Sequence, residues 1–140
     1  MAGIYGDVSY IAPCRFFCSV YSFTGNQIVY RYRFNVSDPR FPPKMGVTHA
    51  RETSFVWNNP AVRTDDMRSR VTDFMSRAWA AFIVDQDPNN HGVQNIPSWE
   101  PYSKSALGQN FVIGEDGFSK EDDNFRSTAI NVIIAEILKL

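Results

Sequence analysis

His49 is the residue of this chain best suited to chemistry. Imidazole takes up and releases protons near neutral pH, so a histidine oriented by a carboxylate can act as the base for a serine nucleophile. It stands in the run Gly46-Val47-Thr48-His49-Ala50-Arg51-Glu52. The sequence contains no Gly-x-Ser-x-Gly motif for the nucleophile and no HGGG-like oxyanion segment. If His49 is a catalytic base, its nucleophile is not marked by a motif in this sequence; a solitary histidine beside a strand is otherwise usually a surface or hydrogen-bonded residue without chemistry.

Metal and redox chemistry are weaker alternatives. The zinc motif His-x-x-Glu-His fails after His49, because Thr53 stands at the final histidine position. Cys14 and Cys18 are the only cysteines, and their spacing of four could place both on one helical face. Two thiols cannot complete a structural zinc site, and His49 and His91 lie far apart in sequence. We expect two ordinary half-buried thiols, no disulfide framework, no metal and no cofactor.

Asn35-Val36-Ser37 is an N-glycosylation sequon, which is used only when it is exposed in a secretory compartment. The first residues carry no positively charged n-region, and Asp7, Pro13 and Arg15 interrupt the apolar residues. Neither a signal peptide nor a membrane-spanning helix is expected. The sequon suggests a secreted parent protein, whereas this chain, expressed as it stands, is expected to remain in the cytoplasm.

The composition is that of a folded chain, with 44% hydrophobic and 14% aromatic residues. At this length about 68 to 70% of the unfolded surface can be buried on folding. Fourteen basic and 15 acidic residues give a net charge of −1. Because no broad positive field would attract phosphates, we do not expect nucleic acid as a partner.

The hydrophobic pattern predicts both helices and strands. Residues 10–23 are expected to form a short amphipathic helix that ends at Gly25-Asn26, and residues 27–35 to form a strand with alternating aromatic side chains. Asp38-Pro39 and Pro42-Pro43 interrupt regular structure after that strand. His49 is therefore expected on a loop beyond the end of a strand.

The second half of the sequence predicts a long helix over 65–84, with apolar residues three and four apart, and a loop through Ser105. A short strand is expected at 111–113, followed by a turn at 114–117. Asp122 or Asp123 is expected to cap a final helix that continues to Leu138. Four aromatic residues could line an acyl pocket, but core packing explains their helical spacing better; they are Phe55, Trp79, Phe82 and Trp99.

Several short motifs, in this order, resemble the C-terminal portion of the type B carboxylesterase and cholinesterase-like family. Tyr5-Gly6-Asp7-Val8 and Ile11-Ala12-Pro13-Cys14-Arg15 are similar to a segment that leads into a helix, and Val29 to Phe34 to the strand before the catalytic histidine. The histidine run follows. Beyond it the resemblance covers Trp79-Ala80-Ala81-Phe82, Asp87-Pro88-Asn89, and Pro97 with Trp99, Pro101 and Tyr102. It extends over nearly all 140 residues.

The resemblance implies the C-terminal part of an α/β-hydrolase fold, with about two sheet strands and flanking helices. It implies that residues 1–140 form a partial carboxylesterase domain, with the serine, the acid and the oxyanion segment encoded upstream. His49 would be the triad histidine, and Glu52 resembles a glutamate that supports the histidine loop. Ala50 replaces a common glycine, and Ala12 replaces a disulfide-forming cysteine.

The expected function is that of a segment of a serine carboxylic-ester hydrolase, inactive alone, whose complete parent takes a carboxylic ester. Whether this chain counts as an enzyme stays open, since it has no nucleophile motif. Substrate-binding residues and the identity of the ester are not predicted. An exposed sheet edge could lead to association. The alternatives are a non-catalytic protein-binding module of α/β-hydrolase type and a subunit that completes another hydrolase fragment in trans. The sequence is compatible with a real truncation and with an incomplete gene model.

Overall fold

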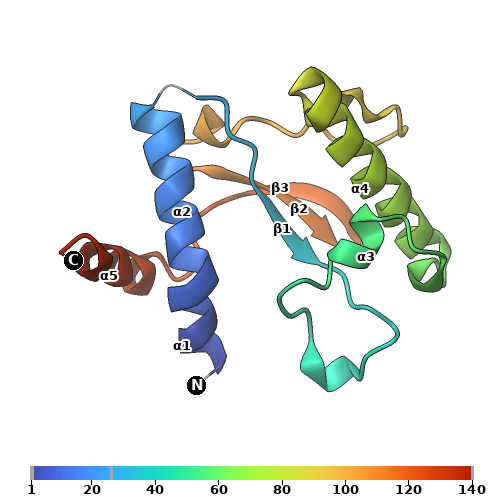
Figure 1. Cartoon of the computed structure of the whole chain (residues 1–140), viewed down its shortest axis with the longest axis horizontal. Coiled ribbons are helices and arrows are strands. Elements are labelled where there is room, and N and C mark those ends of the chain that lie inside the picture. Colours follow the sequence, from blue (N-terminus) through green and yellow to red (C-terminus); the bar gives the residue numbers. More distant parts are fainter. Residues whose placement is uncertain (1, 26, 140) are drawn as a thin grey trace. The chain divides into compact units, whose positions relative to one another are not determined.

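A computed structural model describes residues 2–25 and 27–139 of the chain. The chain divides into two compact units, whose elements are labelled in Figure 1. The first unit contains Met1–Arg31, Glu100–Asn110 and Lys120–Leu140. The second contains Tyr32–Trp99 and Phe111–Ser119. We describe each unit by itself.

The first unit begins with a continuous helical segment in which α-helical and π-helical turns alternate. It comprises α1 (Ala2–Gly6), η1 (Asp7–Ile11), α2 (Ala12–Ser19) and η2 (Val20–Thr24). The expected helix over 10–23 is confirmed, but the helical segment starts earlier. The wider π turn of η1 ends two residues before Pro13, whose ring would clash with the carbonyl four residues before it in a regular α-helix. The π turn lets the helix continue past the proline.

The C-terminal part of the first unit contains η6 (Tyr102–Lys104) and α5 (Ser127–Ile137). The predicted cap of the last helix is wrong. Arg126, in a left-handed conformation, stands at the N-cap position, and Asp123 is instead buried, with 4% of its surface exposed. Gly108 has φ +80°, and a Cβ there would lie 2.1 Å from the Tyr102 ring. Only glycine fits beside this buried tyrosine.

The sheet has three strands in the order β1-β2-β3 (Figure 1). β1 (Tyr32–Asn35) runs parallel to β2 (Gln109–Gly114), with Tyr32 opposite Phe111 and Asn35 opposite Gly114. β3 (Gly117–Asp122) follows β2 after two residues and adds a third strand to the two that were predicted. The predicted strand over 27–35 is confined to its last four residues. Together with the helices, this sheet confirms the α/β class.

The second unit is organised around α4 (Asp66–Asp85), which lies beside the short helix α3 (Thr53–Val56) in Figure 1. The side chain of Asp65 caps α4 by accepting a hydrogen bond from the Arg68 backbone N–H at 2.8 Å. Gln86, in a left-handed conformation, ends the helix. The helix predicted over 65–84 is therefore confirmed. Three 3-10 turns complete the connections: η3 (Pro43–Met45), η4 (Pro60–Val62) and η5 (Pro88–His91).

Aromatic side chains form the core of the second unit. Phe74 of α4 and Phe111 of β2 are buried, and the ring of Trp99 stacks on Phe111 at 5.1 Å between centroids. Phe55 is also fully buried, and the rings of Trp79 and Trp99 lie 5.7 Å apart between centroids. The ring of Phe55 packs against Phe34, at 5.2 Å between centroids. Core packing, as predicted for Phe55, Trp79 and Trp99, is therefore confirmed. Phe82 is the exception, because 46% of its surface is exposed.

Candidate functional site

His49 lies in an exposed position on the loop that connects β1 to α3. We call residues 36–52 the histidine loop. Val36 at its start and Phe55 just beyond its end are both fully buried, so both ends are anchored in the core of the second unit. Ala50 has φ +65°, in the left-handed region that favours glycine. The predicted position of His49, on a loop beyond a strand, is confirmed.

A buried carboxylate organises the start of the histidine loop. The Asp38 side chain, 1% exposed, accepts hydrogen bonds from the Arg40 backbone N–H at 3.0 Å and from Arg40 Nη2 at 2.5 Å. Arg40 Nη2 also donates to Ser54 Oγ in α3 at 2.6 Å. The hydrogen bonds from Arg40 hold the pKa of Asp38 below its usual range. One guanidinium thus connects the entrance of the loop to the helix that follows it.

A second arginine spans the middle of the histidine loop. Arg51 Nε donates to Thr48 Oγ1 at 2.9 Å, and the guanidinium carbon lies 3.3 Å from the centroid of the Phe41 ring. Such a cation–π contact is favourable, and the guanidinium plane suits stacking. Glu52 then begins the first helical turn of α3, where its carbonyl accepts from the backbone N–H groups of Phe55 and Val56. His49 lies in the sequence between Thr48 and Arg51, the two residues that the hydrogen bond from Arg51 Nε to Thr48 Oγ1 joins.

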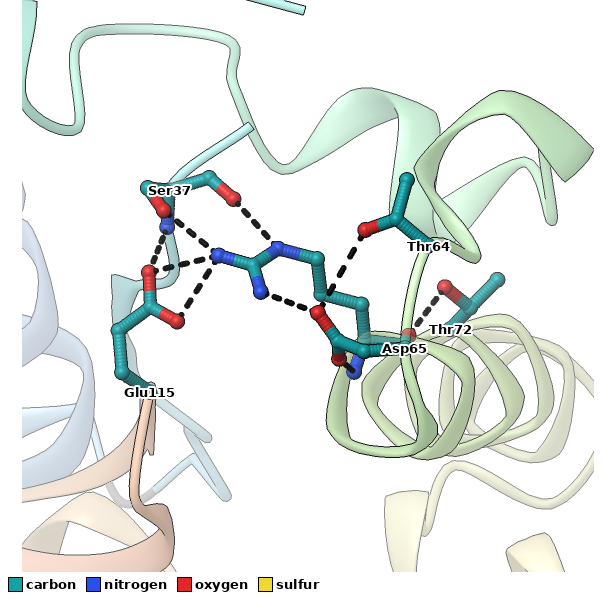
Figure 2. A network of polar contacts seen from close by, with 6 residues as sticks. Ser37, Thr64, Asp65, Thr72 and Glu115 are labelled. Atoms are coloured by element: carbon teal, nitrogen blue, oxygen red, sulfur yellow. Dashed lines mark hydrogen bonds and ion pairs between the residues drawn. The ribbon is translucent and has the colours of Figure 1, made fainter. Parts of the chain in front are cut away.

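A polar network that the sequence did not predict lies after the end of β1. Arg68 Nη2 donates to Ser37 Oγ at 2.7 Å and to Glu115 Oε2 at 3.0 Å, while its Nη1 donates to Asp65 Oδ2 at 2.5 Å. Figure 2 shows Ser37 and Glu115 on one side of this guanidinium and Asp65 on the other. The only sequence signal was Asp65, a typical helix cap three residues before Arg68. The pKa of Asp65 is lowered, chiefly by the Arg68 backbone N–H.

The sequon lies at the same end of β1. Asn35 is the last residue of the strand and is exposed. Ser37, the hydroxyl residue of the sequon, is held by three hydrogen bonds: its backbone N–H donates to Glu115 Oε1 at 2.6 Å, its hydroxyl accepts from Arg68 Nη2 at 2.7 Å, and its carbonyl accepts from Arg68 Nε at 3.1 Å. The structure thus places Asn35 and His49 at exposed positions of the second unit, Asn35 before and His49 within the histidine loop.

The two cysteines lie in the first unit, where Cys14 is exposed and Cys18 is buried. A hydrogen bond from Cys18 lowers the pKa of the Cys14 thiol to about 6, with Arg31 and Arg15 acting in the same direction. The pKa of Cys18 is raised by the same interaction and by burial. Among the described residues, no group of three or more histidine, cysteine, aspartate or glutamate side chains could hold a metal ion.

Both arginines near Cys14 bind one buried carboxylate. Asp123 accepts from Arg15 Nε at 2.9 Å and Nη2 at 2.7 Å, pairs with Arg31, and accepts from the Tyr102 hydroxyl at 2.8 Å. Burial lowers the pKa of Arg15. This cluster joins segments that are far apart in sequence, and all its members have partners that explain them structurally. We therefore assign it to folding of the first unit.

His91 lies in η5 of the second unit. Its Nδ1 accepts from the Val93 backbone N–H at 2.9 Å, and its ring meets the edge of Phe74 at 5.0 Å between centroids. Burial and then the positive charge of Arg77 lower the pKa of His91. An imidazole committed to a backbone hydrogen bond has one nitrogen fewer for proton transfer. Of the two histidines, His49 is exposed and His91 is half-buried.

Comparison with known proteins places the chain in a family. The family model described as Carboxylesterase family matches residues 1–132. This match includes the histidine loop, the sequon, α4 and both strands that follow it. No curated protein matches the chain. In the part of the chain that the structure describes, no helix is both long and apolar enough to cross a membrane. The chain belongs to the carboxylesterase family.

Proposed function

We propose that this chain supplies the C-terminal, histidine-bearing segment of a serine carboxylic-ester hydrolase. The observation that carries the proposal is the position of His49. It is exposed on the loop that follows the carboxyl end of β1, a strand parallel to its neighbour. In α/β folds, ligands bind beyond the carboxyl ends of parallel strands. The match of the chain to the carboxylesterase family supports ester hydrolysis as the reaction class.

In the proposed mechanism, His49 is the general base. It accepts the proton of a serine hydroxyl while the serine oxygen attacks the ester carbonyl, and it returns that proton to the departing alcohol. Water then attacks the acyl-serine while His49 takes a proton from the water; as the acyl–oxygen bond breaks and the carboxylic acid leaves, His49 returns that proton to the serine oxygen. No Gly-x-Ser-x-Gly motif for the nucleophilic serine occurs in these 140 residues. We therefore propose that this serine, and the carboxylate that orients His49, belong to an N-terminal part of the same domain.

The proposed partial domain, residues 1–140, would complete its fold by association. β1 is an outer strand of the sheet order, so it has an edge at which a further strand could add. Large apolar side chains on the N-terminal helical segment are also exposed, among them Ile4, Tyr5 and Phe17. Val8 and Val132 line an apolar hollow of the first unit. We propose these surfaces as contacts with the N-terminal part of the domain.

The same exposed surfaces favour the second candidate function, a non-catalytic protein-binding module. The two candidates differ in what the partner brings. A hydrolase requires a partner that carries the nucleophile, whereas a binding module would form a stable complex without gaining activity. We further propose that the parent protein is secreted and carries a glycan at Asn35, since Asn35 is exposed at the end of β1. Mass spectrometry of protein from a secreting host, with Asn35→Gln as control, tests the glycan.

The function is tested by reconstitution. The chain alone should give no burst of product with an activated short-chain ester, and a serine-directed fluorophosphonate should not label the chain. Both follow if the nucleophilic serine and the oxyanion donors belong to another part of the domain. Mixed with the N-terminal part of a carboxylesterase-family protein that bears Gly-x-Ser-x-Gly, it should co-elute and hydrolyse the ester. Stoichiometric serine labelling of the isolated chain would contradict the proposal. Co-elution without ester hydrolysis would favour the binding module.

A further inference from the structure

The histidine loop has little regular structure of its own. Between β1 and α3 only η3 is helical, and His49 lies at an exposed position in the second half of the histidine loop. A catalytic base must nevertheless be held close to its productive geometry, because displacement by about 1 Å can cost on the order of 100-fold in rate. The loop therefore needs fixed contacts across its length, and two arginines provide them.

The outer contact is made by Arg40. Its guanidinium binds the buried Asp38 carboxylate through Nε at 2.9 Å and Nη2 at 2.5 Å, in the fork geometry that only arginine offers. The same Nη2 reaches Ser54 Oγ at 2.6 Å. Asp38 precedes His49 and Ser54 follows it, so this contact closes the loop around the histidine. Because the Asp38 side chain is almost fully buried, the contact has a rigid base.

The inner contact is made by Arg51, two residues after His49. Its guanidinium carbon lies 3.3 Å from the Phe41 ring centroid, and its Nε donates to Thr48 Oγ1. Thr48 and Arg51 flank the turn that contains His49 and the left-handed Ala50. Phe41 belongs to the opposite arm of the loop. The inner contact therefore restrains the backbone on both sides of the imidazole.

We propose that Arg40 and Arg51 are positioning residues, which form a double clamp on the histidine loop and hold His49 in one orientation before an ester is bound. This inference rests on the proposed role of His49 as a base. It adds that the chain fixes the histidine with its own residues. Preorganisation of this kind removes the ordering cost from the catalytic step.

Nuclear magnetic resonance relaxation of the isolated chain tests the clamp without any enzymatic activity. In the unmodified protein, the amide order parameters of residues 47–51 should lie near 0.85, the value of rigid backbone. Arg51→Ala and Arg40→Ala should lower them below about 0.6, while the amides of α4 stay unchanged. Low values in the unmodified protein, or rigid values in both variants, would overturn the inference.

Arg70→Ala is the matched control. Arg70 Nη2 donates to the carbonyls of Gln94 and Asn95, in the loop that follows η5. Its loss should loosen residues 93–96 and leave residues 47–51 rigid. Loosening of residues 47–51 in this control would contradict a local clamp. If Arg40→Ala does not fold, Thr48→Val remains decisive, because it deletes only one exposed hydroxyl and should lower the same order parameters.

Kinetics of the reconstituted protein separate this inference from the proposed function. Arg51→Ala should lower kcat about 10-fold to 100-fold and leave KM within about twofold. A displaced base reduces the stabilisation of the transition state but does not change the binding of the ester. If His49→Ala does not affect the reconstituted activity, the proposed function fails. The order parameters would then still decide whether the clamp exists.

Discussion

Cys14 and Cys18 lie one helical turn apart, yet their thiols differ in exposure and pKa. The Cys18 thiol donates a hydrogen bond that stabilises the Cys14 thiolate, and Arg31 adds its positive charge. The sequence predicted two ordinary, half-buried thiols, because spacing alone does not reveal a donor–acceptor pair or an arginine 17 residues away. The structure corrects this prediction for both residues: Cys14 is exposed and Cys18 is buried.

The pKa of about 6 at Cys14 predicts its reactivity. Alkylation by iodoacetamide should rise with pH around a midpoint near 6, since the thiolate is the nucleophile. Cys18→Ala should move this midpoint upward, toward the ordinary thiol value of about 8.5, because the hydrogen-bond donor is lost. Peptide mapping identifies the alkylated residue. A midpoint at or above pH 8 in the unmodified protein would contradict this prediction, and Cys14→Ser provides the rate at Cys18 alone.

At the scale of elements, η5 and its following loop depend on a neutral His91. The folded-state pKa of His91 lies below its usual value, so the folded protein binds fewer protons there than the unfolded chain. Its contribution to stability is therefore complete above about pH 6.5 and is lost as pH falls through the folded-state pKa. Protonation would also remove the acceptor of the Val93 N–H.

His91→Asn tests this pH dependence. The asparagine amide oxygen can replace Nδ1 as acceptor for Val93 but does not titrate. We expect the urea midpoint of the unmodified protein to fall relative to that of the variant between about pH 6.5 and 5, and the two to run parallel above pH 7. Parallel midpoints over the entire range would contradict the sign of the shift. His49→Asn, at an exposed position, is the control.

The sequence predicted those elements whose signals are local. Helix α4 has apolar residues three and four apart between two clear ends, and β2 is a short apolar run. The alternation over 27–35 suggested a longer strand than exists. There the Val29 carbonyl accepts from the Tyr102 N–H instead, and Arg31 pairs with Asp123. β3 was missed because Gly-Phe-Ser-Lys-Glu-Asp has no apolar alternation and pairs at an edge.

The candidate site was predictable only in part, for the same reason. His49 and Asn35 stand in short runs that can be read directly. The contact from Arg40 to Ser54 spans 14 residues, and that from Arg68 to Glu115 spans 47. Such pairs form only where the folded chain brings distant residues together. The spacing of prolines and polar residues in a loop does not predict which residues will meet. Such long-range contacts are therefore found only from the structure.

At the scale of the whole molecule, a buried charge cluster joins distant parts of the first unit. Asp123 is bound by Arg15, Arg31 and Tyr102, and its side chain is only 2% exposed. A buried carboxylate must be fully paired, and loss of one partner from a buried ion pair costs about 3–5 kcal/mol. Within the first unit, the cluster therefore connects the N-terminal helical segment with Tyr102 and Asp123, which are far away in sequence.

Asp123→Asn should therefore lower the free energy of unfolding by about 3–5 kcal/mol, measured by urea denaturation at neutral pH. The matched control is Asp122→Asn, one residue earlier. Asp122 is exposed and accepts a hydrogen bond from Ser105 Oγ, so its loss should change the unfolding free energy little. Equal effects of the two substitutions would contradict a special role for the buried carboxylate.

Membership of the carboxylesterase family and the exposed position of His49 lead to one claim, namely that this imidazole is the base for a serine supplied by another part of the domain. The most direct measurement compares His49→Ala with His91→Ala in the reconstituted protein, using kcat/KM for an activated ester. We predict a loss of about 1,000-fold or more for His49→Ala and nearly full activity for His91→Ala. Retained activity in His49→Ala would contradict the account.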